Sequence, residues 1–413
     1  MRGGYSNLQK STQYGRINVY AFVLLQGAAL MTKEYSINDK IYPGGDGVLL
    51  SIADMLAYFE KHGAMRISDL HIKISTPPAY RIDGDLVRMK GSPITKEIAE
   101  GLIYPLLGEK GVTELKRSNA VDCSYITGNL QYRINAFIDN EGLSAAIRAL
   151  GTDIPIPEKI GFPSDVWKDI VKLKHGLVLF TGITGAGKST TIASLIERIN
   201  QTRPCRVITL EDPIEYLFDQ QNAVISQREV GRDVDSFSNG LRSMMREDPD
   251  IIFVGEMRDA ETVSMTLTAA ETGHLVFSTL HTRDVTGSIT RILDFFPSGR
   301  QHEVKNQLSL GLAYVISQKL VPKKDNSGRL VAMEILNNNH ATSNLIRIGK
   351  IEQIYSQMQT KTKNQTDEKM ITLERHLARL VKIGKVDLLE AQKWANQPKS
   401  FVDAMNTDAD ISW

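Results

Sequence analysis

The chain has few cysteines, no excess charge of either sign and no long hydrophobic run. Its 413 residues include two cysteines, Cys123 and Cys205, and 49 basic against 48 acidic residues. Two isolated cysteines exclude a disulfide framework and a four-cysteine zinc site, so we expect no zinc and a reducing cytoplasm. The balanced charge gives no global attraction to nucleic acid, so no nucleic-acid partner is expected. Because no run of about 18 apolar residues exists, no segment is expected to span a bilayer.

Residues 182–189 (GITGAGKS) carry the most specific motif in the chain. They match the phosphate-loop pattern of nucleotide-binding proteins, and the composition predicts about 0.02 such matches by chance. The preceding HGLVLFT predicts a buried strand, and the following TTIASLIERIN predicts a helix whose N-terminal dipole is directed at the phosphates. Lys188 is expected to reach the β- and γ-phosphates, and the Ser189 hydroxyl to ligate Mg²⁺. The predicted nucleotide-binding residues are Gly182, Ile183, Thr184, Gly185, Ala186, Gly187, Lys188, Ser189 and Thr190.

Two further apolar runs end in acidic residues, and parallel sheets place ligand-binding groups at such carboxyl ends. DPDIIFVGE delivers Glu256, which is predicted to hold the Mg²⁺ shell or to polarise water. ITLEDPIEY ends its strand at Glu211 and Asp212, with Glu215 on the following loop. One acidic group is expected to serve the metal while another orients the attacking water. Simple solvation at the surface is an equal alternative for Asp212.

Histidines and arginines give weaker signals. His274 and His281 flank a predicted strand, and their spacing places them on opposite faces, so they do not form a simple metal pair. We interpret them as hydrogen-bonding sensors of nucleotide state. An arginine is expected to meet the negative charge on the γ-phosphate, but the residues alone do not choose among the candidates. These are Arg133, Arg148, Arg228, Arg232, Arg242, Arg246, Arg258 and Arg291.

The pattern of strands and helices predicts two domains. Residues 1–47 are predicted to be a disordered or untranslated extension, and 48–150 a small α+β domain. Its pattern predicts a helix from Val48 and strands at 68–74, 78–89 and 131–140. Residues 151–165, rich in proline and glycine, predict a linker. Strands alternating with helices over 166–400 predict a parallel sheet followed by helical stretches at 300–320 and 370–396. The predicted strands lie at 175–181, 206–212, 227–231, 250–256 and 274–281. Residues 401–413 are predicted to be a tail.

The start of the chain leaves three alternatives open. Residues 17–30 follow a short basic segment and resemble a weak signal-peptide core that polar residues interrupt. Translation from Met31, with the first 30 residues upstream of the true start, is favoured because a nucleotide-dependent enzyme would find no ATP outside the cell. A disordered or membrane-associating extension and a signal peptide are the alternatives.

The motifs, in their order and spacing, resemble those of the secretion ATPases and, among these, the type IV pilus retraction ATPases (the PilT family). The resemblance runs from about Val48 to Val386 and is carried by GITGAGKSTT, ITLEDPIEY, QREVGRD, LRSMMREDPDIIFVGEMRDAET and TAAETGHLVFSTLHT. It implies an α/β fold with a PAS-like α+β N-terminal domain. It also implies a RecA-like P-loop NTPase domain with a helical C-terminal extension, and a ring-shaped homohexamer with ATP between the two domains.

The resemblance also implies roles for particular residues. Lys188, Glu215 and Glu256 become catalytic, with Ser189 and Glu256 near Mg²⁺. His274 and His281 belong to the His box, and Arg133 and Arg148 match N-domain arginines that reach the nucleotide. Hydrolysis would change the interdomain angle and power pilus depolymerisation and twitching motility. The implied partner is an inner-membrane pilus platform protein, contacted peripherally from the cytoplasm.

The sequence departs from the retraction family at residues 341–348, and this leaves the direction of force open. The family carries a motif close to AIRNLIRE, whereas this chain has ATSNLIRI. A pilus assembly or type II secretion ATPase is an alternative, although these are usually longer and carry a four-cysteine zinc insertion. Type IV secretion relatives, a RecA-like DNA motor and a non-hydrolysing nucleotide-binding module are further alternatives.

Overall fold

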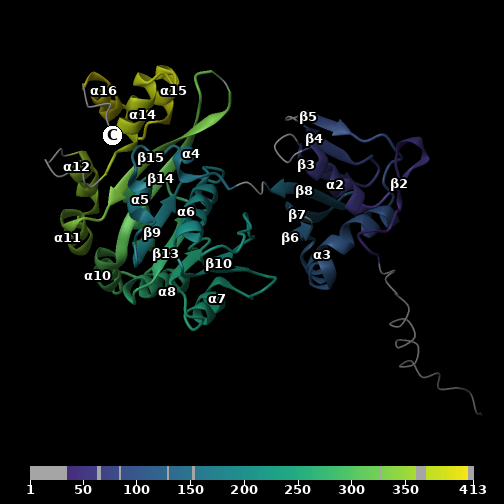
Figure 1. Ribbon diagram of the computed structural model, residues 1–413, viewed down its shortest axis with the longest axis horizontal. Coiled ribbons are helices and arrows are strands. Elements are labelled where there is room, and N and C mark those ends of the chain that lie inside the picture. The colour runs from purple at the N-terminus through teal and green to yellow at the C-terminus, as the bar shows by residue number, and fades with distance from the viewer. Residues whose placement is uncertain are drawn as a thin grey trace, which may run out of the picture.

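The computed structural model describes residues 35–62, 67–82, 85–127, 130–150, 154–325, 327–359 and 369–407. It contains a six-stranded and a seven-stranded sheet, each with its own helices, so the predicted mixed α/β class is confirmed (Figure 1). No helix within these ranges has the length and apolar character needed to cross a membrane. Residues 1–34 of the predicted extension lie outside the described residues. Tyr42–Pro43 (β1) pairs with Leu49–Leu50 (β2) and Tyr42 is buried, so the ordered fold begins before residue 48.

The N-terminal sheet is antiparallel and has the strand order β5-β4-β3-β8-β7-β6. The strands predicted at 68–74, 78–89 and 131–140 are confirmed, as is the helix predicted after Val48; two further strands, β6 and β8, were not predicted. Helices α2 and α3 pack against one face and bury side chains such as Phe59 and Tyr132. The elements are α2 (Ile52–His62), β3 (Ile67–Lys73), β4 (Ala79–Ile82), β5 (Asp85–Arg88), α3 (Lys96–Ser118), β6 (Ala120–Thr127), β7 (Leu130–Asp139) and β8 (Gly142–Leu150).

A row of polar side chains crosses the other face of this sheet. Asp69 of β3 lies opposite Arg148 of β8, which lies opposite Arg133 of β7, and Arg133 lies opposite Ser124 of β6. Directly opposed residues of an antiparallel pair point to the same face. The buried residues of β7 are the alternate ones, so this polar row points away from α2 and α3.

The second sheet is parallel except at one edge and has the order β11-β10-β12-β13-β9-β14-β15. Its predicted strands at 175–181, 206–212, 250–256 and 274–281 are confirmed. The strand predicted at 227–231 instead spans Val224–Glu229. Only β15, at the edge, runs antiparallel to its neighbour. The strands are β9 (Gly176–Thr181), β10 (Arg206–Glu211), β11 (Val224–Glu229), β12 (Ile251–Val254), β13 (Leu275–Leu280), β14 (Leu312–Pro322) and β15 (Arg329–Asn337).

Helices cover both faces of this sheet, as a crossover topology requires. Side chains of β9 alternate between the two cores: Leu177 and Leu179 face one, Val178 and Phe180 the other. Helices α7 to α11 contribute to the first core, and α5 and α6 to the second. The helices are α4 (Pro157–Ile160), α5 (Val166–Ile170), α6 (Lys188–Thr202), α7 (Phe237–Met244), α8 (Ala260–Glu271), α9 (Val285–Asp294), α10 (Gln301–Gly311), α11 (His340–Ile348) and α12 (Ile354–Gln359).

Two expectations for the C-terminal part are corrected. The helix predicted over 300–320 ends at Gly311, and the chain continues as strand β14 because this segment pairs with β9 inside the sheet. The predicted tail begins inside a helix, α16, whose Phe401 is buried against α14. The terminal helices are α14 (Leu373–Lys382), α15 (Leu388–Trp394) and α16 (Pro398–Asn406).

The edge strand β15 is covered by the segment that leads into α14. Ile371 exchanges two backbone hydrogen bonds with Ile335 of β15, at 2.8 and 3.1 Å. Two residues before Ile335, the backbone N–H of Met333 donates to Nδ1 of His376, at 2.8 Å. His376 is buried, and burial lowers its pKa to about 4, so the ring is neutral and accepts this bond near neutral pH.

Candidate functional site

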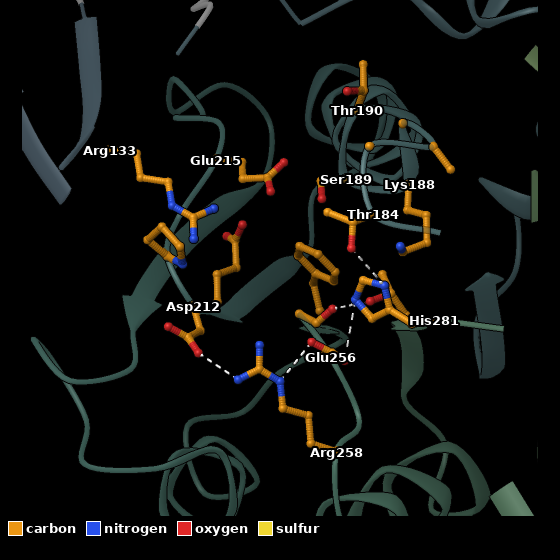
Figure 2. A pocket seen from close by; sticks show the side chains of 18 of the residues that line it. Arg133, Thr184, Lys188, Ser189, Thr190, Asp212, Glu215, Glu256, Arg258 and His281 are labelled. Carbon is orange, nitrogen blue, oxygen red and sulfur yellow. Dashed lines mark hydrogen bonds and ion pairs between the residues drawn. The ribbon is translucent and has the colours of Figure 1, made fainter. Parts of the chain in front are cut away.

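A pocket of about 480 Å³ opens at the carboxyl ends of the central strands of the second sheet. This is where parallel sheets place their ligands, because helix N-termini and strand ends meet there. The pocket is also bounded by Arg133 from the N-terminal sheet (Figure 2). Its lining residues are Arg133, Thr184, Gly185, Ala186, Gly187, Lys188, Ser189, Thr190, Glu211, Asp212, Pro213, Glu215, Phe237, Phe253, Gly255, Glu256, Arg258, Thr279, His281 and Leu320.

The phosphate loop joins β9 to α6 in a backbone conformation that glycine allows. Gly185 and Gly187 have φ angles of 77° and 85°, in the left-handed region, and α6 begins at Lys188. A Cβ on Gly182 would lie 2.5 Å from the carbonyl oxygen of Gln318, so β14 leaves no room for a side chain there. The Gln318 amide supports the loop from β14 by donating to Ala186 O at 2.7 Å. Neighbouring strands therefore fix the loop that the sequence predicted.

Lys188 is buried at the floor of this loop. Its ammonium group donates to the carbonyl oxygens of Gly182, at 2.8 Å, and Ile183, at 3.3 Å. Burial lowers the pKa of Lys188, and the negative charges of Glu256 and Glu215 oppose that shift. The lysine therefore lies between the loop and two carboxylates, where a negatively charged phosphate would find a fixed positive charge.

A polar network joins the ends of three neighbouring strands. Arg258 donates to Glu256 at 2.8 Å and to Asp212 at 3.1 Å, so it connects the ends of β12 and β10 (Figure 2). His281, after β13, has Nε2 3.4 Å from Glu256 Oε1 and Nδ1 3.4 Å from the Thr184 hydroxyl. The network thus runs from the phosphate loop through His281 and Glu256 to Asp212.

His281 is uncharged at neutral pH in this setting. Its pKa is lowered first by burial and then by the positive charge of Lys188, while the carboxylate of Glu256 opposes both. A neutral ring donates at one nitrogen and accepts at the other. His281 can therefore relay a change at the phosphate loop to Glu256 by exchanging hydrogen bonds.

Glu211, at the end of β10, is buried beneath the pocket. Burial raises its pKa to about 7, although the Thr209 hydroxyl donates to it at 2.8 Å. Glu215, on the next loop, adds to the rise through its negative charge. Glu211 is therefore partly protonated near neutral pH, whereas a solvated glutamate would be fully ionised.

Because Glu211 has a raised pKa, we expect the free energy of unfolding to depend on pH, and we expect Glu211→Gln to remove this part of the dependence. Because the folded-state pKa of about 7 exceeds the ordinary 4.5, the folded protein holds more protons than the unfolded chain between these values. The contribution of Glu211 to stability is therefore fully present below about pH 4.5 and is lost as pH rises to 7. We expect the free energy of unfolding of the wild type, relative to Glu211→Gln, to fall by about 3 kcal/mol across this window.

Urea unfolding of both proteins at several pH values from 5 to 8 measures this difference. The exposed Glu303→Gln serves as the control and should keep the pH dependence of the wild type. Parallel pH profiles for the wild type and Glu211→Gln would contradict the assignment.

Arg133 and Arg148 occupy different positions relative to the pocket. Arg133 projects from β7 into it, on the side of Glu215 and Asp212 and across from Lys188 (Figure 2). Arg148 does not line the pocket; its Nε donates to Asp69 at 2.8 Å, and its side chain is 63% exposed. The two arginines are direct cross-strand neighbours, so Arg148 lies beside the arginine that enters the pocket.

Other predicted residues fall outside the lining as well. Gly182 and Ile183 direct their carbonyl oxygens to Lys188, as described above. His274 lies at the amino end of β13, away from the pocket, where its ring bonds to Ala269 O at 2.9 Å. The structure brings together the remaining predicted residues, which are Thr184, Gly185, Ala186, Gly187, Lys188, Ser189, Thr190, Glu215, Glu256, His281 and Arg133.

Several residues of the pocket are not singled out by the sequence pattern. Arg258 was one of many candidate arginines, and its position two residues after Glu256 was the signal that could have selected it. Glu211 and Asp212 were recognised as strand ends but not assigned. Phe237, Phe253, Thr279 and Leu320 had no sequence signal, because only the packing of the strands and of α7 brings them to the pocket.

The pocket fits a nucleotide with a magnesium ion. The glycine loop and the N-terminus of α6 form a cradle for phosphates, and a Cβ at Gly182 would disturb it. The Ser189 hydroxyl and the Glu256 carboxylate are the oxygen donors that Mg²⁺ prefers. Among the described residues, no group of three or more His, Cys, Asp or Glu side chains could hold a metal.

The fold and the pocket define a P-loop nucleotide-binding protein with a mostly parallel sheet. Residues 159–382 match the family described as Type II/IV secretion system protein. The chain is 40% identical to the type IV pilus retraction ATPase PilT of Pseudomonas aeruginosa, over 85% of this chain and all of that protein. It is 39% identical to a twitching motility protein of Neisseria gonorrhoeae, over 78% of this chain and 86% of that protein.

A solved structure agrees with these relatives. The crystal structure of the pilus retraction motor PilT with bound ADP superposes with a TM-score of 0.76 at 41% identity, covering 86% of this chain and 99% of that one. The chain therefore belongs to the Type II/IV secretion ATPase family and, within it, to the group of the pilus retraction ATPases. The resemblance inferred from the sequence motifs is confirmed.

Proposed function

We propose that this protein hydrolyses ATP to power type IV pilus retraction, by depolymerising the pilus during twitching motility. The observation that supports this most strongly is the position of Arg133. A side chain from the N-terminal sheet lines the same pocket as the phosphate loop of the second sheet. A nucleotide bound there would contact both domains, so its hydrolysis can change how the domains are oriented.

Each pocket residue has a role in this proposal. The loop amides and Lys188 bind the phosphates, and Arg133 stabilises the charge that develops on the γ-phosphate. Glu215 positions or activates the attacking water, and Glu256 serves the metal shell together with Ser189. When bound, Mg²⁺ would neutralise phosphate charge and orient the nucleotide.

Nucleotide state would then set the angle between the domains. Arg133 and its neighbour Arg148 lie on one sheet, and the phosphate loop lies on the other. Phosphates attract both arginines and favour a closed arrangement, and loss of the γ-phosphate weakens that attraction. Opening and closing would deliver force to the pilus base, through peripheral contact with an inner-membrane platform protein at the cytoplasmic face of the membrane.

The proposed assembly is a homohexameric ring. We expect the purified protein to form hexamers when it is mixed with Mg²⁺ and a non-hydrolysable ATP analogue, because the nucleotide fixes the relative orientation of the domains from which neighbouring subunits would build the ring. Multi-angle light scattering with and without the analogue measures the mass. A protein that stays monomeric under both conditions would contradict the ring.

Deletion of the gene in the host tests the direction of force. Loss of twitching with retained and excess surface pili supports retraction. Cells without pili would instead support the second candidate, a pilus assembly or secretion ATPase. One observation counts against retraction and keeps that candidate open: Ile348, which replaces the final glutamate of the retraction motif, is 53% exposed at the end of α11. A surface partner would therefore meet an apolar side chain instead of a charge.

A further inference from the structure

One buried carboxylate outside the pocket is bonded to both domains. Glu229 ends strand β11, and its side chain is 4% exposed. From the N-terminal sheet, the Ser124 hydroxyl lies 2.8 Å from its Oε1 and 2.6 Å from its Oε2. From the second domain, the backbone N–H of Ile214 donates to its Oε2 at 3.1 Å. Glu229 therefore links a strand of one sheet to a loop of the other.

The two groups that Glu229 connects are each adjacent to a pocket residue. Ile214 directly precedes Glu215, the residue assigned to the attacking water. Ser124 lies opposite Arg133 across the β6–β7 pair, on the same face of the sheet. Glu229 is thus connected to Glu215 through the adjacent residue Ile214. It is connected to Arg133 through Ser124, the cross-strand neighbour of that arginine.

A second bond holds the same loop from the N-terminal sheet. The buried amide of Gln131, on β7, donates to the carbonyl oxygen of Ile214. Both backbone polar groups of Ile214 are therefore engaged, its N–H by Glu229 and its C=O by Gln131. Arg232 completes the cluster by donating to Ser124 at 3.0 Å, with its guanidinium 3.7 Å from Glu229.

We propose that Ser124, Glu229 and Gln131 form an interdomain latch that positions Glu215 for catalysis only when the N-terminal sheet is docked. Such an arrangement makes hydrolysis depend on domain orientation, because undocking removes the bond from Gln131 to Ile214 and the bonds from Ser124 to Glu229. Glu229 then loses the group that orders its carboxylate, and the loop that carries Glu215 is held less firmly. Glu229 and Ser124 do not line the pocket, so they act as positioning residues and not as nucleotide ligands. The latch rests on the proposed ATPase function and adds a control of turnover to it.

The test compares Ser124→Ala, Glu229→Gln and the double variant with the wild type. A shift of the water-positioning group by a fraction of an ångström lowers turnover without weakening nucleotide binding, so we expect kcat of each single variant to fall about tenfold. The affinity for a fluorescent ADP analogue should change less than about twofold, since phosphate contacts remain. Because both changes open the same latch, the double variant should lose little more than the worse single variant.

Two further measurements make the outcome specific. Ser118→Ala, which removes another N-domain serine hydroxyl that bonds to the backbone carbonyls of Glu114 and Ala120, should behave like the wild type. Hydrogen–deuterium exchange of the peptide around Ile214 should accelerate in Ser124→Ala, since the N–H of Ile214 loses an ordered acceptor.

Unchanged kcat in Ser124→Ala and Glu229→Gln would overturn the latch. So would a loss of nucleotide affinity with kcat preserved, because that result would assign these residues to domain packing alone. The wild type is measured in the same assays, and if it does not hydrolyse ATP, the proposed function fails. The latch is then tested independently by hydrogen–deuterium exchange: an unchanged exchange rate around Ile214 in Ser124→Ala would overturn it.

Discussion

Glu256→Gln should lower ATP turnover by at least about 100-fold while nucleotide binding is retained. Glu256 lies at the end of β12 and bonds to Arg258 at 2.8 Å, beside His281 and the phosphate loop. Glutamine has nearly the same shape but removes the charge that serves the metal shell and polarises water. The phosphate cradle does not depend on that charge, so ground-state binding should persist.

Steady-state phosphate release and titration with a fluorescent ADP analogue separate these effects. The exposed Glu303→Gln, on α10, is the matched control and should leave both quantities unchanged. If Glu256→Gln hydrolyses ATP at the wild-type rate, the chain is better described as a nucleotide-binding assembly module than as a motor.

Arg133→Ala should reduce turnover by about 100-fold or more, because arginines that meet the transferring phosphate carry large effects in P-loop enzymes. Arg133 is the pocket residue supplied by the N-terminal sheet. Arg133→Lys keeps the charge but loses the planar fork, so its turnover should lie between those of the alanine variant and the wild type.

Arg148→Ala should have a smaller effect, about tenfold, since this side chain lies beside Arg133 but is held by Asp69 outside the pocket lining. Arg117→Ala, at the end of α3, removes an exposed arginine of the same domain and serves as the control. Phosphate-release assays measure all four variants. Wild-type turnover in both Arg133→Ala and Arg148→Ala would show that neither arginine of the N-terminal sheet contributes to turnover.

The parts of the site that could be predicted from the sequence depend on local geometry. The phosphate loop needs glycine at fixed positions and a helix that begins at Lys188, and both features depend only on residues that are neighbours in the sequence. Glu256 could be predicted as well, because it follows a continuous apolar strand. These features can be predicted without knowing how the rest of the chain packs.

The choice among the arginines depends on how two sheets pack, which no local pattern encodes. Arg133 and Arg148 are equivalent by sequence, and even neighbours in register, yet only one lines the pocket. The resemblance to a family proposed the pair, and the structure distinguishes its members. His274 and His281 differ for a simpler reason: they sit at opposite ends of one strand, and only the carboxyl end faces the site.

Strand β14 illustrates the limit of periodicity. Its residues 312–320 follow an amphipathic helix and contain apolar residues at spacings that also suit a helix. The segment is a strand because it is inserted beside β9, where Val315 and Ile316 face opposite cores. Tertiary pairing overrode the local preference.

The covered edge of β15 has a consequence for truncated forms of the protein. An open edge strand offers unpaired backbone groups to other chains and is a common start of aggregation. Here a backbone segment at Ile371 and an imidazole at His376 occupy that edge in place of an eighth strand. A chain that ends before Ile371 would lose the groups that cover the edge of β15, together with the last helices. We expect such a chain to aggregate, so its ATPase activity could not be measured in solution. Strong acid would act in the same direction, since a charged His376 can no longer accept the bond from Met333.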